Sequence, residues 1–109
     1  MIEKVTEYSR SGFRCIEKLL DDDPVAINHI VLPYLEVIPE HDSNSNVYLI
    51  IIAGTMSVLF EEQPIHEYHA GSILTIPYKT HMRISNLARD TMLEFFIIKA
   101  PSPRLMEEH

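Results

Sequence analysis

Six histidines and a single cysteine are the residues of this sequence best suited to metal binding or proton transfer. His66 and His69 lie in the segment HEYH, but residues three apart on a strand point to opposite faces, so they cannot hold one metal ion together. Cys15 alone excludes an intramolecular disulfide and a cluster of thiolate ligands. No motif ties an acid or a histidine to Cys15, so we expect a buried structural cysteine rather than a nucleophile.

The overall composition is that of one soluble globular domain. The chain has 109 residues, of which 46% are apolar and 23% charged. It carries a net charge of −7 with scattered basic residues, which argues against nucleic-acid binding. No apolar run approaches the ~20 residues of a membrane-spanning helix, and no signal-peptide pattern opens the sequence, so we expect a cytoplasmic protein.

Short segments rich in β-branched residues predict an all-β, antiparallel domain that forms a sandwich or small barrel. Gly54 separates residues 46–53 from 55–60 and predicts a tight hairpin between them. Residues 13–20 fit a strand or a helix almost equally, and we assign a strand. The predicted strands are residues 13–20, 25–32, 46–53, 55–60, 65–69, 72–76, 81–86 and 91–100.

The apolar run VYLIIIA (47–53) does not alternate with polar residues, as a strand with one wet face would. Both faces of this strand should therefore be covered, either by the ends of the chain or by a second subunit. For a domain of this size we favour a homodimer.

Two segments resemble the paired motifs of the cupin superfamily, whose fold is a jelly-roll barrel. The segment GSILTIPYKTHMRISN places Gly71, Pro77, His81 and Asn86 at the spacing of the second cupin motif, although its turn is about one residue short and lacks the family's glycine. In the first motif, counting back from Gly54 assigns the ligand positions to His41, Ser43 and Val47. The resemblance covers about residues 25–101 and implies a single cupin-like domain over 1–109, with N-terminal strands in 1–20 and a loose tail at 102–109.

Metal-binding members of this family use two histidines and a glutamate from the first motif and one histidine from the second. The resemblance leaves this chain His41 and His81 for a weak metal site, because Ser43 and Val47 replace the other two ligands. His29 or Glu36 could complete the site if either points into the barrel. Otherwise His29 is a hydrogen-bonded strand histidine outside the pocket.

The resemblance thus implies a small-molecule-binding protein whose ligand is a small polar metabolite, a sugar or a carboxylate. The alternative is a metal-dependent enzyme of the dioxygenase or isomerase type. Asn44 and Tyr48 should add neutral polar groups near the barrel mouth, and Arg83 shares a strand face with His81 and would favour an anionic group. The expected pocket residues are His41, Ser43, Asn46, Val47, His81, Arg83 and Glu94.

Overall fold

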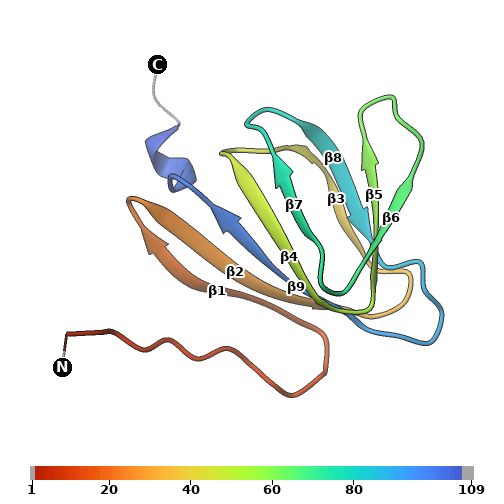
Figure 1. The fold of residues 1–109 in the computed structure, drawn as a ribbon, viewed down its shortest axis with the longest axis horizontal. Helices are drawn as coiled ribbons and strands as arrows, with labels where there is room; N and C mark the ends of the chain where they lie inside the picture. The colour runs from red at the N-terminus through yellow and green to blue at the C-terminus, as the bar shows by residue number, and fades with distance from the viewer. Residues whose placement is uncertain (1, 107–109) are drawn as a thin grey trace.

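The computed structural model describes residues 2–106 and confirms an all-β domain built from antiparallel strands. Residues 2–106 form nine strands followed by a short 3₁₀ helix, η1 (Figure 1). Their bounds are β1 Cys15–Asp22, β2 Val25–Leu32, β3 Val37–Asp42, β4 Val47–Ala53, β5 Thr55–Phe60, β6 His66–His69, β7 Ile73–Ile76, β8 His81–Ser85, β9 Leu93–Lys99 and η1 Pro103–Leu105. None of the helices in residues 2–106 is long and apolar enough to cross a membrane.

The strands form two sheets that face each other across the core. The first sheet has the order β1-β2-β9-β4-β7, and the second has the order β3-β8-β5-β6. Figure 1 shows the two sheets diverging from the end where β4 passes into β5. Several strands that are consecutive in sequence, such as β2 and β3 or β4 and β5, belong to different sheets. The chain therefore crosses repeatedly between the sheets, as in a jelly roll.

Alternate residues of each strand fill the space between the sheets. On β4 these are Val47, Leu49 and Ile51, each at most 3% exposed, whereas Tyr48 and Ile52 on the other face are 36% and 47% exposed. The apolar run of β4 therefore has one covered and one partly open face within a single protomer. Its core partners are Ile30, Leu32, Met56, Val58, Ile76, Met82, Ile84, Leu93 and Phe95.

Gly54 forms a corner between the two sheets rather than the predicted hairpin turn. β4 pairs with β7 and β9, while β5 pairs with β6 and β8, so the two strands on either side of Gly54 are not hydrogen-bonded to each other. Gly54 has a φ of +82°, and a Cβ atom there would lie 2.3 Å from the Met92 carbonyl oxygen. Only glycine permits both this backbone conformation and the close approach of residue 92.

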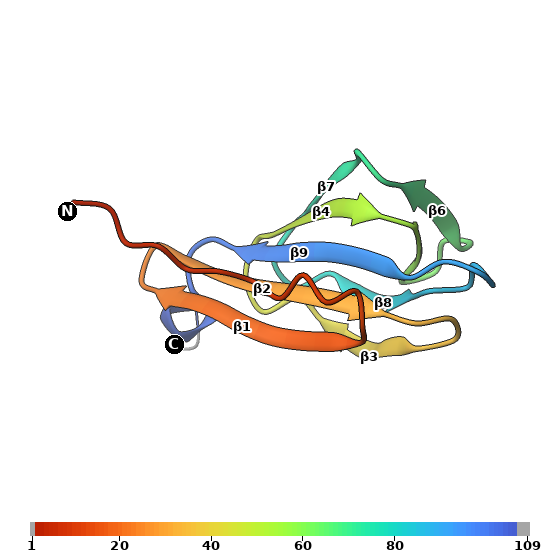
Figure 2. The ribbon, with the colours of Figure 1, turned by 90° about the horizontal axis from the view of Figure 1, so that it is seen from below.

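Both ends of the described chain differ from the expectation. Residues 13–20 are largely strand, as assigned, but β1 starts at Cys15, and residues 2–14 form an arm without strand pairing. Figure 2 shows this arm running along the first sheet. The tail is docked rather than loose as far as residue 106: Ser102 is 1% exposed, and its hydroxyl donates to Asp21 Oδ1 at 2.7 Å. Residues 107–109 of the predicted tail lie outside the described residues.

Candidate ligand cavity between the two sheets

A cavity of about 210 Å³ lies between the sheets, where β2, β4 and β9 face β3 and β8. Its walls are mainly apolar and belong to the core, and its polar groups gather at one end. The lining residues are Ile16, Asn28, Ile30, Ile38, His41, Ser43, Asn44, Val47, Leu49, Met82, Ile84, Ile97 and Lys99. An apolar enclosure with a few convergent polar groups is the usual design of a small-ligand site.

The strand register brings Asn28 and Lys99 to the polar end. On β2, Asn28 pairs with Ile97 of β9, and Ala26 pairs with Lys99, so Asn28 and Lys99 are diagonal neighbours on the inner face. Asn44 joins them from the segment between β3 and β4. Three chain segments that are distant in sequence therefore contribute the polar groups.

Asn28 has an unsatisfied oxygen. Among the solvent-shielded side-chain polar atoms of residues 2–106, Asn28 Oδ1 alone lacks a hydrogen-bond partner. A buried acceptor in this state destabilises the fold by about 1–3 kcal/mol. A ligand with an N–H or O–H group in the cavity could remove this cost.

Lys99 is the cation of the cavity. Burial lowers the pKa of its ammonium group, and the charge of Lys18 lowers that pKa further, while Asp21 acts in the opposite direction. Within residues 2–106 Lys99 makes no ion pair, since the nearby acids Asp21 and Asp23 bind Arg104 instead. The cavity thus holds a partly desolvated ammonium group that has no anionic partner.

A second hollow, of about 240 Å³, continues the cavity toward the protein surface. Asn28, Asn44 and Lys99 line both the cavity and this outer hollow, so they lie where the two meet. The outer hollow adds Lys18 and Arg104, and Arg104 is already paired with acids. The entrance is therefore polar and carries two lysines.

Three of the expected pocket residues do line the cavity. His41 lies at its edge with an exposed side chain, and its Nδ1 is 2.8 Å from the Pro39 carbonyl oxygen. The Ser43 hydroxyl donates to the Pro77 carbonyl at 2.6 Å and accepts the Thr80 N–H at 2.8 Å. These two hydrogen bonds of Ser43 hold the loop before β8 in place. Val47 contributes only apolar surface to the cavity wall.

His81 and Arg83 lie on the opposite face of the second sheet, contrary to the expectation. In the register of β3 and β8, His41 pairs with the buried Met82, and Asp42 pairs with His81, so the His41 and His81 side chains point to opposite faces. The expected alternation of β8 is wrong, because Met82 rather than His81 faces the core.

His81 instead belongs to an exposed acidic cluster. Its ring nitrogens lie 3.0 Å from Glu40 Oε2 and 2.8 Å from Asp42 Oδ1. The hydrogen bond to Glu40, followed by the one to Asp42, raises the pKa of His81. Arg83 points the same way, with Nη1 4.0 Å from Glu40 Oε1.

Asn46, Glu94 and His29 are also outside the cavity. Asn46 accepts the Tyr78 N–H at 3.2 Å and so holds the loop between β7 and β8. Glu94 and His29 lie on the outer face of the first sheet, where they contact each other at 2.6 Å. Tyr48 also faces outward and does not line the mouth.

The donor set inside the barrel does not fit the family's metal centre. Of the four ligand positions of the resemblance, His41 alone offers a free donor toward the cavity, because Ser43 is committed to backbone groups, Val47 has none, and His81 points outward. Neither suggested replacement completes it: His29 is on the outer face, and Glu36 binds Arg14 at 2.6 Å. One imidazole does not make a transition-metal site.

A larger hollow, of about 430 Å³, lies elsewhere on the surface, between the β5–β6 turn and the β7–β8 loop. Its lining includes Glu61, Glu62 and Gln63, which are exposed. It contains neither an unsatisfied buried polar atom nor an unpaired cation of the described residues. The smaller internal cavity is therefore the better candidate site.

Sequence reasoning missed Asn28 and Lys99. In VAINHIVL both sets of alternate residues are mainly apolar, so the pattern does not say whether Asn28 or His29 faces inward. Lys99 is the last residue of an apolar strand, a position where a lysine is usually exposed to solvent, so its sequence context does not indicate a cavity residue. A systematic search for polar residues inside apolar strands would have identified Asn28, but not its orientation.

Relatives of known structure place these observations in a family. No family model matches the chain. The uncharacterized protein MJ0764 of Methanocaldococcus jannaschii is 48% identical over 105 residues, which cover 95% of this chain and 90% of that protein. Its crystal structure, described as an RmlC-like cupin family protein with a double-stranded β-helix fold, superposes with a TM-score of 0.93 at 46% identity and covers 99% of both chains.

More distant structures share the fold alone. A cupin superfamily protein of Desulfitobacterium hafniense has a TM-score of 0.72 at 16% identity and covers 88% of this chain and 84% of its own. The cupin domain of Schizosaccharomyces pombe Cnp3 has a TM-score of 0.71 at 14% identity, with 83% and 66% covered. Together with the close relationship to MJ0764, the fold and the spacing of Gly54, Gly71, Pro77 and His81 lead to one conclusion: this chain belongs to the RmlC-like cupin family.

Proposed function

We propose that this cupin binds a small carboxylate metabolite between its two sheets without a metal ion in the barrel. The observation that carries the proposal is the unpaired, partly buried Lys99 beside the unsatisfied Oδ1 of Asn28. A ligand with one carboxylate and one N–H or O–H donor would satisfy both groups. A neutral sugar would satisfy Asn28 but would leave the ammonium of Lys99 unpaired.

The size of the cavity supports a small ligand. Its volume of about 210 Å³ is below the ~300–1,000 Å³ of typical sites for drug-sized molecules. The carbon skeleton of the ligand would lie against Ile30, Leu49 and Ile97. A hydrogen bond between Lys99 and a carboxylate is worth roughly 1.5–3 kcal/mol, and satisfying Asn28 adds about 1–3 kcal/mol.

The charge of Lys99 can be tested against that of a neighbouring lysine. Ligand-observed NMR with 2-hydroxybutyrate, 3-hydroxybutyrate and their neutral amides would measure binding to the wild type, Lys99→Met and Lys18→Met. We expect the carboxylates to bind the wild type and Lys99→Met to weaken their binding at least tenfold. Lys18→Met removes the same charge from the outer hollow, where solvent screens it, and should weaken binding much less. Amides that bind as well as carboxylates, or equal losses in the two variants, would refute the assignment.

A metal-dependent dioxygenase or isomerase is the alternative function. It would need metal ligands at positions 43 and 47. This chain has there a serine whose hydroxyl is hydrogen-bonded to the Pro77 carbonyl, and a valine. The ligand-binding function therefore has more support from the residues present.

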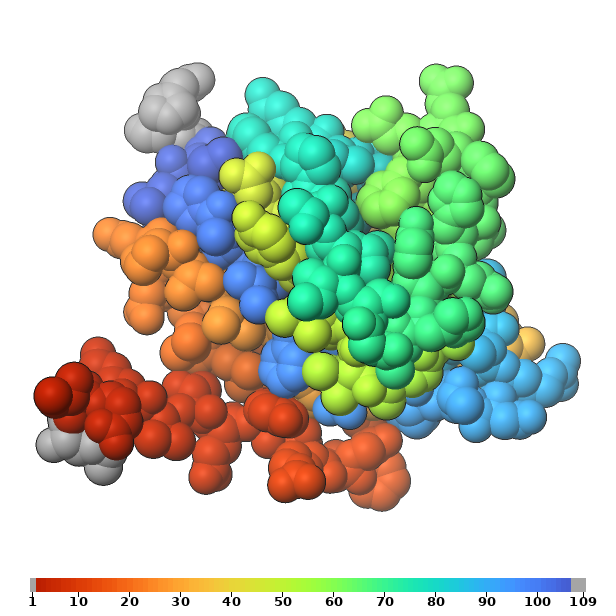
Figure 3. Space-filling view, viewed as in Figure 1, coloured from red at the N-terminus to blue at the C-terminus, as the bar shows by residue number. Residues whose placement is uncertain are grey.

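We also propose that the protein forms a homodimer through the outer face of β4 and β7. Tyr48, Ile52 and Ile73 are 36%, 47% and 65% exposed there, and β7 is the edge strand of its sheet. Figure 3 shows side chains of β4 and β7 on the surface that faces the viewer. A second copy would cover this apolar face, as the sequence of β4 suggested.

A further inference from the structure

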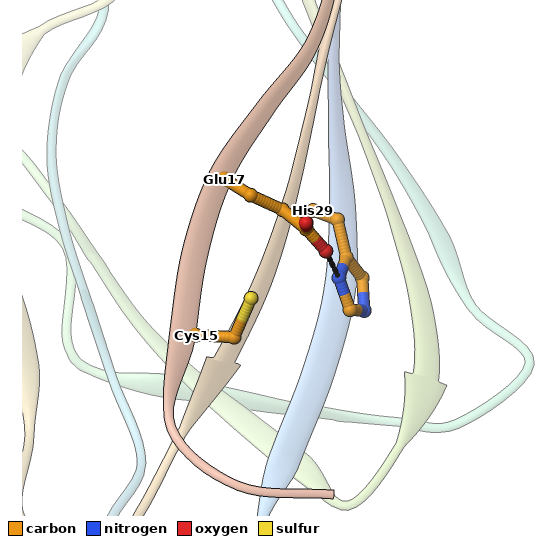
Figure 4. A group of neighbouring side chains, drawn as sticks. All are labelled: Cys15, Glu17 and His29. Atoms are coloured by element: carbon orange, nitrogen blue, oxygen red, sulfur yellow. Dashed lines mark hydrogen bonds and ion pairs between the residues drawn. The ribbon is translucent and has the colours of Figure 1, made fainter. Parts of the chain in front are cut away.

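A cluster of potential metal ligands lies on the outer face of the first sheet, away from the ligand cavity. Cys15 and Glu17 are two residues apart on β1 and therefore share a face, and Glu17 pairs directly with His29 of β2. Figure 4 shows the three side chains converging from the two strands. One potential ligand atom from each residue lies within 4.8 Å of the other two.

The imidazole of His29 is held in a fixed orientation at the base of this cluster. It is 0% exposed, and its ring lies 4.9 Å from that of Tyr8 and 5.0 Å from that of Phe96, measured between centroids. Nδ1 faces Glu17 Oε2 at 2.7 Å, and Nε2 faces Glu94 Oε2 at 2.6 Å. A carboxylate on one ring nitrogen is the usual partner that orients a metal-binding histidine, because it fixes the tautomer and leaves the other nitrogen free to bind the metal.

The two carboxylates on the His29 ring leave room for a cation in the cluster. A neutral imidazole has one N–H and can donate to only one of the two carboxylates. If Nε2–H donates to Glu94, the lone pair of Nδ1 faces the carboxylate oxygen of Glu17, which is repulsive unless a proton or a metal ion lies between them. The neighbouring sulfur of Cys15 makes a metal ion the better match, since thiolate, imidazole and carboxylate are the common ligands of Zn²⁺.

We propose that Cys15, Glu17 and His29 bind one Zn²⁺-type ion per chain, with Glu94 as the residue that positions His29. The ion would replace the proton between His29 Nδ1 and Glu17 Oε2, whose 2.7 Å separation would widen to about 3.3 Å to admit it. It would also bind the sulfur of Cys15, whose thiol proton would be released to solvent. Three protein ligands leave the fourth tetrahedral position to a water molecule. This site is independent of the ligand cavity, because residues on its strands alternate between the two faces.

The N-terminal arm covers the proposed site. The Ser9 N–H donates to Glu17 Oε2 at 2.8 Å, and the Tyr8 ring packs against His29 at a tilt and against Phe96 edge-on. A hollow of about 280 Å³, lined by Tyr8, Arg10, Gly12, Ile52 and Glu94, lies on the Glu94 side of the cluster. Metal binding would therefore fasten the arm to the sheet.

The single cysteine makes the test specific to this site. Tag-free protein, freed of metal and kept reduced, would be titrated with Co²⁺ while its near-ultraviolet absorption is recorded. We expect one Co²⁺ per chain and a thiolate-to-cobalt charge-transfer band, which in this chain can come only from Cys15. Zn²⁺ should displace the cobalt and abolish the band, and competition with a chelator would give the Zn²⁺ affinity.

Variants then identify the other ligands. Cys15→Ser should lose the band, and both Cys15→Ser and Glu17→Gln should lower the Zn²⁺ affinity at least tenfold. Glu94→Gln should keep the band but lower the affinity about 10–100-fold, as expected for a residue that orients a ligand. His81→Ala is the matched control, because His81 also lies between two carboxylates but has no cysteine nearby, and it should retain both the band and the affinity.

The absence of a charge-transfer band in the wild type would overturn the proposal, whatever the variants do. So would a Zn²⁺ affinity that survives Cys15→Ser and Glu17→Gln but falls in His81→Ala, since the ion would then lie in the exposed acidic cluster. The carboxylate test concerns the opposite face of the sheet and different variants, so its outcome does not depend on this one.

Discussion

Replacing Gly54 by alanine should destabilise the fold far more than the same change at the other two glycines. All three glycines have positive φ, at +80° for Gly12, +82° for Gly54 and +95° for Gly71. An alanine in this conformation costs about 1–2 kcal/mol, partly offset by about 0.4–1 kcal/mol from a less flexible unfolded chain. At Gly12 and Gly71 nothing lies within 4 Å of an added Cβ, so we expect losses of about 1 kcal/mol or less.

At Gly54 a steric cost is added to the conformational one. The new Cβ would lie 2.3 Å from the Met92 carbonyl oxygen and 3.0 Å from Leu93 Cα, both backbone atoms that cannot rotate away. Since β9 begins at Leu93 and lies between β2 and β4, relief would require a shift of a central strand. Overpacking of this kind costs about 1–3 kcal/mol, which brings the total to about 2–4 kcal/mol.

Urea denaturation followed by circular dichroism would measure the three free energies of unfolding. For a domain of this size each kcal/mol lowers the melting temperature by roughly 4–8 °C, so Gly54→Ala should melt about 10–30 °C below the wild type. A Gly54→Ala variant as stable as Gly71→Ala, within about 0.5 kcal/mol, would show that the corner is not sterically closed.

Two further predictions concern the outer faces. His81 has a raised pKa, so its ion pairs with Glu40 and Asp42 should stabilise the fold fully below the unfolded pKa of about 6.5 and lose this effect as the pH rises through the folded value. The wild type should therefore exceed His81→Gln in unfolding free energy by more at about pH 5.5 than at about pH 8.5, and equal differences at low salt would contradict the role of His81. Ile73→Lys should convert the proposed dimer to a monomer in light scattering at micromolar concentration, whereas Leu87→Lys, on an exposed loop outside this face, should not. A wild type that is already monomeric would refute the dimer.

The strands could be predicted from the sequence, but the direction of their faces could not. β2 occupies 25–32 as expected, since a run of β-branched residues ending at Pro33 has a clear boundary. On β8 the choice between His81 and Met82 depended on which residues the second sheet presents to the core, and that is a tertiary property. A polar residue in an apolar strand is recognisable in sequence, whereas the partner it meets comes from another strand.

The same limit explains which site residues were found. His41, Ser43 and Val47 follow a motif with fixed spacing from Gly54, and all three line the cavity. The cluster of Cys15, Glu17 and His29 is formed by pairing of β1 with β2, with Glu94 added by β9. No local spacing encodes the contact between His29 and Glu94, which are 65 positions apart.

The alternation along β2 limits which insertions and deletions this family branch can accept. Asn28 belongs to the cavity and His29 to the outer cluster, although they are consecutive residues. One residue gained or lost before Asn28 within the strand would exchange the two side chains, placing an imidazole in the cavity and an amide against two carboxylates. A single indel would therefore remove both proposed sites at once. Length variation among relatives should fall instead in the arm before Cys15 or in the loop between β8 and β9, where no strand register is at stake.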